Sequence, residues 1–445
     1  MRFGHRLHST KVGSCRNVYL PVIGRQSKAF LPPYSTSEVS VNQGEIMKKK
    51  LNSCLAIIVT FLGACACAFG TPLSGAVTGV LTQAGSPYLV MGNLVLPAGQ
   101  QLTIQQGVTL DFQGNYYFEV DGTIDVSGTA TNPVLFTADN HANGWGGFRI
   151  VGNWNSNIFD NAIFEYGRAL TPYSPPYHGP SMEGAGMYVE DGCVTVAGCV
   201  FRYNHSTTHG SAISTFGCAD ILVENSVFTW NASVGGCGGL GAINFGNSSP
   251  TNVNLMKISL LGCVIAYNTA CDDGGGVFAA GTSASDGNIF IANNLIYSNT
   301  CTGVWAPESA AAGVFIGCRV VNNVFCGNVV AANAAPTKSQ VVLNGCDFRN
   351  NIVWGGTGQA VVFDVSGSPT IQYNCVQGGY AGTGNISSDP MFVNASANNF
   401  SLDAGSPCVD AGTTNGLTLS ATDFLGNPRI AGEVDPILWT TKRRN

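Results

Sequence analysis

The sequence reads CVFRYN at residues 199–204, and the same short pattern recurs along the chain. SVFTWN follows at 226–231, CVIAYN at 263–268, NLIYSN at 294–299 and NVFCGN at 323–328. Between the asparagines the separations are 27, 37, 31 and 29 residues. A repeat of roughly 20–50 residues that contains short β-type segments indicates a solenoid, in which each repeat stacks on its neighbours.

A second element alternates with the first and is rich in glycine. It reads GAGMYV (184–189), GSAIST (210–215), GLGAINF (239–245), GGGVFA (274–279) and AAGVFI (311–316). Glycine adopts the positive φ that a sharp bend needs. The two elements together predict an all-β parallel β-helix of roughly ten coils, which at ~4.8 Å per coil would be about 50 Å long.

In such a solenoid each residue stacks on its copies in the coils above and below. The apolar member of the pattern should form a buried column, and the asparagine should sit at the bend that follows. Asparagine tolerates the left-handed conformation and can bond both the backbone and its own copies. The predicted stack consists of Phe201, Asn204, Phe228, Asn231, Ile265, Asn268, Ile296, Asn299, Phe325 and Asn328.

The N-terminal region predicts export. From Met47 the chain reads MKKKLNSCLAIIVTFLGACACAFG, which has the lysines, apolar run and small residues of a secretory signal. A membrane-spanning helix is the alternative, but the apolar run is shorter than the ~20 residues a span needs. Residues 62–65 (LGAC) also resemble a bacterial lipobox with Cys65 as the lipidated residue. We expect residues 1–46 to be absent from the mature protein, residues 47–68 to be the signal, and the protein to be secreted or at the cell surface.

Charge and cysteine content further limit the possible functions. After residue 68 the chain holds 11 Lys/Arg and 24 Asp/Glu, a net charge of −13, so we expect no nucleic-acid partner. The same region holds 12 cysteines and no C-x-x-C pair, so no metal site is expected. DGC, FGC, IGC and NGC place Cys193, Cys218, Cys318 and Cys346 at matching points of the repeat. A buried column of thiols and a set of disulfides both remain open.

Three stretches carry a family resemblance. The F-x-x-N and G-G-A-I-type repeats resemble those of polymorphic outer-membrane proteins and, more broadly, right-handed parallel β-helix proteins of the pectin-lyase-like superfamily. Residues 93–150 (NLVLPAGQ…VDGTIDVSG…PVLFTAD…GWGGFRI) resemble the first coils of exported bacterial β-helix proteins. Residues 387–435, with DPMF, FSL, AGSPCVDAG and DFLGNPR, resemble the module called choice-of-anchor Q. The resemblance implies a right-handed helix over residues 69–385 and a capping module over residues 386–445.

The pectin-lyase-like resemblance implies polysaccharide lyases and hydrolases among the relatives, so a catalytic site has to be weighed. A D-D pair occurs at Asp272 and Asp273, but the N-T-D and R-I-K motifs of a polygalacturonase-like site are missing. The pair is more simply the start of a glycine bend. Calcium would be expected only if the protein were a lyase.

Binding is the use that the sequence favours. The proline-rich insertion at 170–184 carries Tyr173, Tyr177 and His178, and Trp305 lies in a later loop. Aromatic rings of this kind stack on sugar rings. We therefore expect a monomeric structural, adhesive or carbohydrate-binding surface protein without a cofactor, which meets a polysaccharide or a host surface. Membrane contact is expected only through export or a lipid anchor. A lyase or hydrolase acting on acidic glycans is the alternative.

Overall fold

A computed structural model describes residues 70–417 except for nine short gaps, and residue 422. The gaps are residues 173–178, 234–240, 247–256, 282–283, 285–287, 304–307, 332–336, 357–361 and 367–368. The chain divides into two units, Met1–Ala68 and Phe69–Asn445. The N-terminal extension, the predicted signal and Cys65 all lie outside the described residues. Within the described part, no helix is long and apolar enough to cross a membrane.

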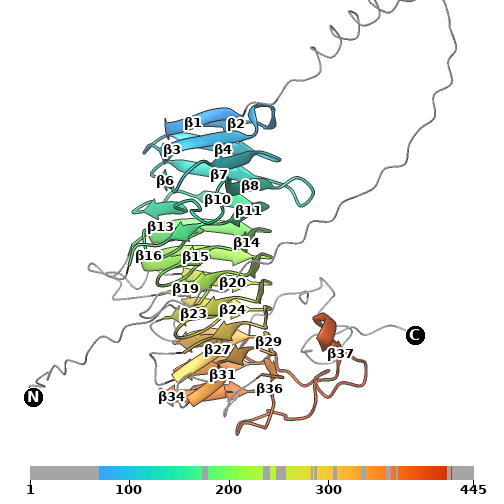
Figure 1. Cartoon of the computed structure of the whole chain (residues 1–445). Helices are drawn as coiled ribbons and strands as arrows, with labels where there is room; N and C mark the ends of the chain where they lie inside the picture. The colour runs from blue at the N-terminus through green and yellow to red at the C-terminus, as the bar shows by residue number, and fades with distance from the viewer. Residues whose placement is uncertain are drawn as a thin grey trace, which may run out of the picture. The chain divides into compact units, whose positions relative to one another are not determined.

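Three columns of short parallel strands wind into a stack of coils (Figure 1). The first column contains β2 (Gly79–Leu81), β4 (Gln101–Gln105), β7 (Thr123–Ser127), β10 (Asn157–Asp160), β13 (Met187–Ala197), β16 (Ile213–Glu224), β20 (Lys257–Leu261), β24 (Ile289–Ala292), β28 (Arg319–Val321), β32 (Asp347–Arg349) and β35 (Thr370–Gln372). The second contains β1 (Thr71–Ala76), β3 (Tyr88–Leu96), β5 (Thr109–Phe112), β8 (Val134–Ala138), β11 (Ala162–Glu165), β14 (Val200–Arg202), β17 (Val227–Thr229), β21 (Val264–Ala266), β25 (Leu295–Tyr297), β29 (Val324–Cys326), β33 (Ile352–Trp354) and β36 (Cys375–Val376).

The third column runs through the other halves of the long strands β1, β3, β13 and β16. It adds β6 (Phe118–Val120), β9 (Phe148–Val151), β19 (Ile243–Phe245), β23 (Val277–Ala280), β27 (Glu308–Ile316), β31 (Thr337–Asn344) and β34 (Val362–Ser366). Every pairing in these columns is parallel and joins a strand to its equivalent in the next coil. The predicted all-β, right-handed parallel β-helix is confirmed.

Alternation of side chains along each strand creates the core. In β8, Val134 and Phe136 are fully buried, whereas the intervening Leu135 faces outward. In the second column Phe201 lies in register with Phe228, and Phe228 with Ile265. The register continues from Ile265 to Ile296 and from Ile296 to Phe325, and all five side chains are fully buried. The rings of Phe201 and Phe228 stack with centroids 5.1 Å apart. One apolar column thus runs along the axis.

An asparagine ladder follows the bend after this column. Asn204 Nδ2 donates to Asn231 Oδ1 at 2.9 Å, and Asn231 Nδ2 donates to Asn268 Oδ1 at 3.0 Å. The series continues through Asn299 to Asn328. It ends where Gln340 Oε1 accepts from Asn328 Nδ2 at 3.1 Å. A Cβ on Gly356 would clash with Gln340 Nε2, so Gly356 leaves the space that Gln340 fills.

The left-handed conformation expected for these asparagines falls instead on the residue before each of them. The φ values are 57° at Tyr203, 57° at Trp230 and 58° at Tyr267. A left-handed residue turns the chain sharply and leaves its own side chain outside the coil. The asparagine that follows can then point inward and bond the backbone.

A second ladder, which the repeat pattern did not predict, lies at the bend before the second column. Asn294 Nδ2 donates to Asn323 Oδ1 at 2.9 Å, and Asn323 Nδ2 donates to Asn351 Oδ1 at 3.0 Å. Earlier coils place Cys199, Ser226 and Cys263 at this position, where they hydrogen-bond to backbone groups.

A six-stranded sheet of very short strands completes the coils. It consists of β12 (Arg168–Ala169), β15 (His205–Ser206), β18 (Ala232–Ser233), β22 (Thr269–Ala270), β26 (Thr300–Cys301) and β30 (Val329–Val330).

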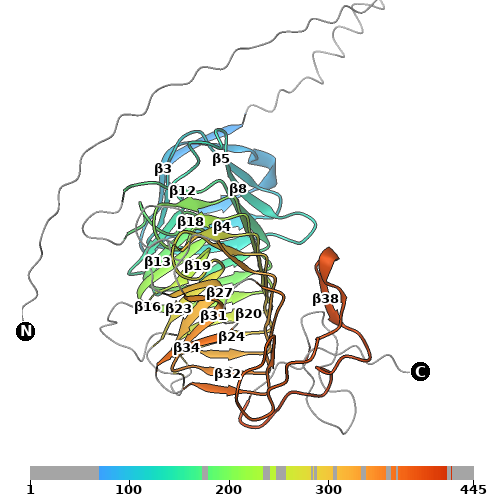
Figure 2. The same cartoon turned by 60° about the horizontal axis from the view of Figure 1, so that its bottom comes forward.

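The described C-terminal segment differs from the coils. Strands β37 (Phe392–Asn394) and β38 (Asn399–Leu402) pair antiparallel around the short 3-10 turn η4 (Ala395–Ala397). Phe400 packs on Tyr297 with ring centroids 5.0 Å apart, and Asn398 Nδ2 donates to Tyr267 Oη at 2.7 Å. Figure 2 shows β38 beside the later coils. The hairpin therefore contacts the flank of the solenoid.

Candidate functional site

A pocket of about 460 Å³ opens on the outer surface of the N-terminal coils. Its polar lining consists of Asn115, Asn143, Arg149, Arg168, Thr171 and Ser181. Ala142, Leu170 and Pro180 add apolar surface. No acidic residue is among the described residues that line it. A volume of this size is within the usual range for a small-molecule or sugar-binding site.

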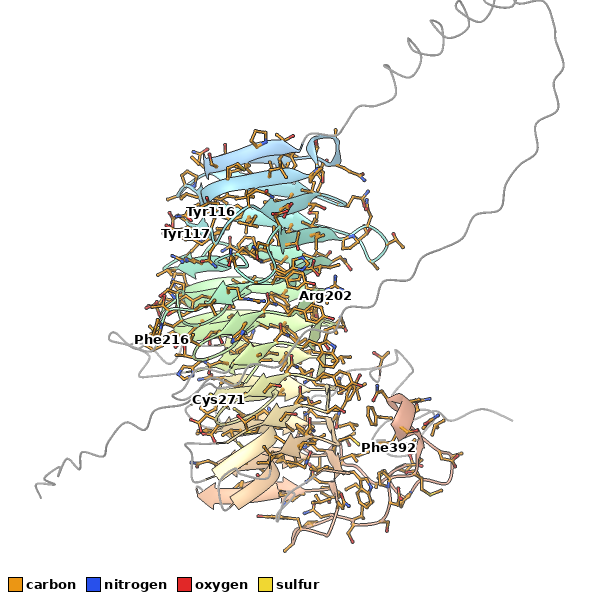
Figure 3. All side chains as sticks on the ribbon, in the orientation of Figure 1. Tyr116, Tyr117, Arg202, Phe216, Cys271 and Phe392 are labelled. Carbon is orange, nitrogen blue, oxygen red and sulfur yellow. The ribbon has the colours of Figure 1, made fainter. Side chains whose placement is uncertain are left out.

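Arg149 is the unusual residue of this pocket. It belongs to β9, where Phe148 and Ile150 point into the core, so alternation directs Arg149 outward. Its guanidinium carbon lies 3.6 Å from the centroid of the Tyr117 ring, a cation–π contact. Figure 3 shows Tyr117 near the N-terminal end of the stack, on the side away from Arg202. The neighbouring strand β6 places Glu119 in register with Arg149.

The guanidinium of Arg149 has no hydrogen-bond partner among the described residues. Its Nε is buried and, among the residues that the structure describes, Arg149 donates no hydrogen bond and forms no ion pair. Burial lowers the pKa of Arg149, and Tyr117 and Glu119 oppose that shift. Buried polar groups normally have partners. An arginine with free donors at a pocket wall can bind a carboxylate with two parallel hydrogen bonds.

Arg168 supplies a second positive charge at the pocket. Its Nη1 donates to the carbonyl oxygens of Gly167 at 2.9 Å and Tyr203 at 2.7 Å, and its Nη2 donates to His141 O at 2.8 Å. These acceptors are neutral, and burial lowers the pKa of Arg168. The charge is held in place without a carboxylate from the described part of the chain. An anion in the pocket would stabilise the charged form of both arginines.

Amides and hydroxyls complete the lining. Asn115 Nδ2 donates to Asn143 O at 3.1 Å, and Thr171 N donates to Ser181 O at 3.0 Å. The second bond joins the two ends of the proline-rich insertion. Tyr173, Tyr177 and His178, the predicted binding residues, lie in the part of this insertion outside the described residues. The described residues on either side of them, Thr171 and Pro180, line the pocket.

A row of aromatic rings runs along the axis from the pocket. His141 stacks on Tyr166 at 3.7 Å between ring centroids, and Tyr166 stacks on Tyr203 at 5.5 Å. One coil further on, Trp230 stacks on Tyr267 at 4.9 Å. Tyr203 and Trp230 are 42% and 53% exposed. Arg168 links the row to the pocket through its bond to Tyr203 O.

The sequence itself carries a signal for this row. Each exposed ring occupies the left-handed position before the ladder asparagine, and the sequence reads FRYN, FTWN and IAYN there. Because that side chain must point away from the coil, a large aromatic residue at this place predicts an exposed ring. The buried positions of the repeat do not by themselves indicate this row. Trp305, the ring that the sequence singled out, lies outside the described residues.

The candidate catalytic pair, Asp272 and Asp273, lies far along the chain from the pocket. Asp272 is buried and Asp273 half-buried in the bend before β23, and the Asp273 carbonyl oxygen accepts from Gly241 N at 3.3 Å. This position agrees with the start of a glycine bend, and nothing in the structure tests the alternative of a catalytic role. Glu165, near the aromatic row, is held by Arg202 Nη2 at 2.6 Å and by Thr137 Oγ1 at 2.9 Å. Across the described ranges no three His, Cys, Asp or Glu side chains gather as metal ligands.

Comparison with known proteins identifies the fold of the N-terminal coils. Residues 75–173 match a family model described as a pectate-lyase-like β-helix domain. No curated protein matches the chain. The matched residues include Arg149 and Arg168 and most of the pocket wall. The chain is therefore a parallel β-helix protein whose first coils are similar to the pectate-lyase-like β-helix domain.

Proposed function

We propose that this chain is an exported surface protein that binds an acidic polysaccharide, with a sugar carboxylate held by Arg149. The observation that carries this proposal is a half-buried guanidinium at a pocket wall, with a buried Nε and donors that no described residue uses. Arg168 adds positive charge, and the amides and hydroxyls of the lining suit sugar hydroxyl groups. No cofactor is required for binding of this kind.

The aromatic row supports a ligand that is longer than one sugar. It begins beside Arg168 with His141 and Tyr166 and continues to the exposed rings of Tyr203 and Trp230. Sugar rings bury apolar C–H surface against such side chains. The two features lie on consecutive coils, so a chain lying along the axis could contact both. Export rests on the lysine-rich apolar segment from Met47, and retention at the surface on the lipobox-like LGAC or on the C-terminal module.

The test compares one glycan with and without its carboxylates. Calorimetric titration of the protein with oligogalacturonate should show binding, and the carboxyl-reduced form of the same oligomer should bind at least about 10-fold more weakly. Arg149→Gln should lose about 10- to 100-fold in affinity for the acidic form, because it removes a charge-assisted pair. Lys257→Gln, which removes an exposed charge at the start of β20, is the matched control.

Three results would count against the proposal. Equal affinity for the acidic and the reduced oligomer would remove the role of the carboxylate. Unchanged affinity in Arg149→Gln would remove the role of the pocket. Release of unsaturated or reducing sugar ends, with or without calcium, would establish the lyase or hydrolase alternative in place of a binding protein.

A further inference from the structure

Two thiols from separate parts of the chain meet at the C-terminal end of the solenoid. Cys375 is the first residue of β36, which is the last strand of the second column. Cys408 follows the β37–β38 hairpin. Both are fully buried. They belong to one apolar cluster that also contains Ile352 of β33 and Phe400 and Leu402 of β38. The cluster joins the last coils to the C-terminal segment.

The backbone on each side of this pair is fixed. Cys375 N donates to Asn351 O at 2.9 Å within the strand ladder. Cys408 N donates to Ser406 Oγ at 3.1 Å, and Ser406 Oγ in turn donates to Pro390 O at 2.6 Å. Disulfides require two cysteines whose backbones already hold the side chains face to face. These bonds fix the backbone at both ends of the pair, within the apolar cluster that the two side chains share.

The two thiols interact within this cluster. Their side-chain interaction lowers the pKa of Cys408 and, together with burial, raises that of Cys375. Cys375 Sγ also lies 3.2 Å from Ser388 O. Thiolate is the form that attacks a disulfide.

We propose that Cys375 and Cys408 form a disulfide that fastens the C-terminal segment to the last coil of the β-helix. Oxidation takes place while the chain folds, before the pair is buried, and a disulfide-bonded oxidant such as oxidised glutathione accepts the electrons. One of the two thiolates attacks the oxidant, forms a mixed disulfide and releases one thiol. The other thiolate then attacks the protein sulfur of that mixed disulfide and releases the second thiol. Two protein thiols and one disulfide become one protein disulfide and two thiols, with no net proton or electron left over.

The cross-link would hold in place the segment that covers the last coil. β36 is the last described strand of its column, and its outer edge pairs in parallel with Ile386, where Val376 N donates to Ile386 O at 2.9 Å. Without that cover the edge would be open to association with other chains. Residues 376–407, which include the β37–β38 hairpin, form the closed loop. A disulfide of this span restricts the unfolded segment and keeps the hairpin against Tyr297 and Tyr267.

The experiment refolds the full chain with oxidised and reduced glutathione, alkylates it under denaturing conditions without reduction, and maps the peptides. A peptide that joins Cys375 to Cys408 is expected, and it should disappear after reduction. Proteolysis of the native protein should spare residues 376–407 when oxidised and cut them at least several-fold faster when reduced. Cys408→Ser should be cut at the fast rate in both conditions. Cys199→Ser, a change at a buried thiol outside the pair, should behave as the unaltered chain.

Alkylation of both Cys375 and Cys408 in the refolded, oxidised protein would overturn the proposal. So would a linked peptide that joins either residue to a different cysteine. Because peptide mapping reads the bond directly, the result holds even if Cys408→Ser fails to fold. The outcome is independent of glycan binding, so failure here leaves the proposed function standing.

Discussion

Asn231 illustrates how one side chain can provide the hydrogen-bond partners that a bend of the coil requires. Its Nδ2 donates to Phe201 O at 2.9 Å and to Asn268 Oδ1 at 3.0 Å. Its Oδ1 accepts from Asn204 N at 3.1 Å and from Asn204 Nδ2 at 2.9 Å. The side chain is 1% exposed, so water cannot replace any of these bonds. An amide, with donors on one side and an acceptor on the other, is the group that repeats along such a ladder.

Asn231→Asp should therefore destabilise the protein by about 2–4 kcal/mol, since it turns two donors into an acceptor that faces two acceptors. The melting temperature measures the effect. Asn399→Asp is the control, because Asn399 is exposed and its Oδ1 only accepts a bond from Ser401 N. An unchanged melting temperature for Asn231→Asp would mean that the ladder bonds contribute nothing.

His205 should make stability depend on pH. Burial, with a smaller contribution from Arg168, lowers the pKa of His205 below 6.5. The folded state therefore favours the neutral ring. The stability that this preference provides is present in full above the unfolded-state pKa of about 6.5, and it is lost as the pH falls toward the lower pKa of the folded state. The melting temperature should fall between about pH 7 and about pH 5. His205→Gln should fall less steeply over the same range, and equal slopes would refute the assignment.

Among the structural elements, the sequence predicts those that recur in every coil. The F-x-x-N spacing alone names the residues that the structure places in one column, because each coil carries the same residue types at the same bend. The second ladder is harder to see, since Cys199, Ser226 and Cys263 precede Asn294 in its column. The pocket was not predictable. Asn115 and Thr171 come from connections that do not recur, Arg149 is an outward-facing residue of β9, and no spacing rule brings the three together.

The C-terminal hairpin is the element whose attachment is easiest to weaken. Phe400 is 7% exposed and contacts Tyr297 at 5.0 Å and Phe392 at 5.4 Å between ring centroids. Phe400→Ala should cost about 3–5 kcal/mol locally, by loss of burial and creation of a cavity. Hydrogen exchange should then speed up in β37 and β38 and remain unchanged in β8 and β11. Equal acceleration in all four strands would show that the hairpin and the coils unfold as one unit.

Across the whole molecule, the stability of each coil depends on the coils stacked on either side of it. Each coil pairs only with the coils on either side, so a defect should spread to its neighbours first. Phe201→Ala should increase hydrogen exchange most in β11, β14 and β17, which flank the lost ring, and least in β33. A uniform increase from β2 to β35 would instead mean that the solenoid opens in a single step.

This rigid stack is also what gives the pocket its shape. Arg149 is fixed by the register of β6, β9 and β13, and Arg168 by three carbonyl oxygens, so both charges are in place before a ligand arrives. The proposed binding of a glycan would then require little rearrangement. The aromatic row extends the same surface along the axis.

The most direct measurement is a crystal structure of the protein with a bound oligogalacturonate. We predict a sugar carboxylate within hydrogen-bonding distance of the Arg149 guanidinium, with the remaining sugars extending toward Tyr203 and Trp230. An oligomer bound elsewhere on the solenoid, with the donors of Arg149 still unpaired, would contradict the proposed function.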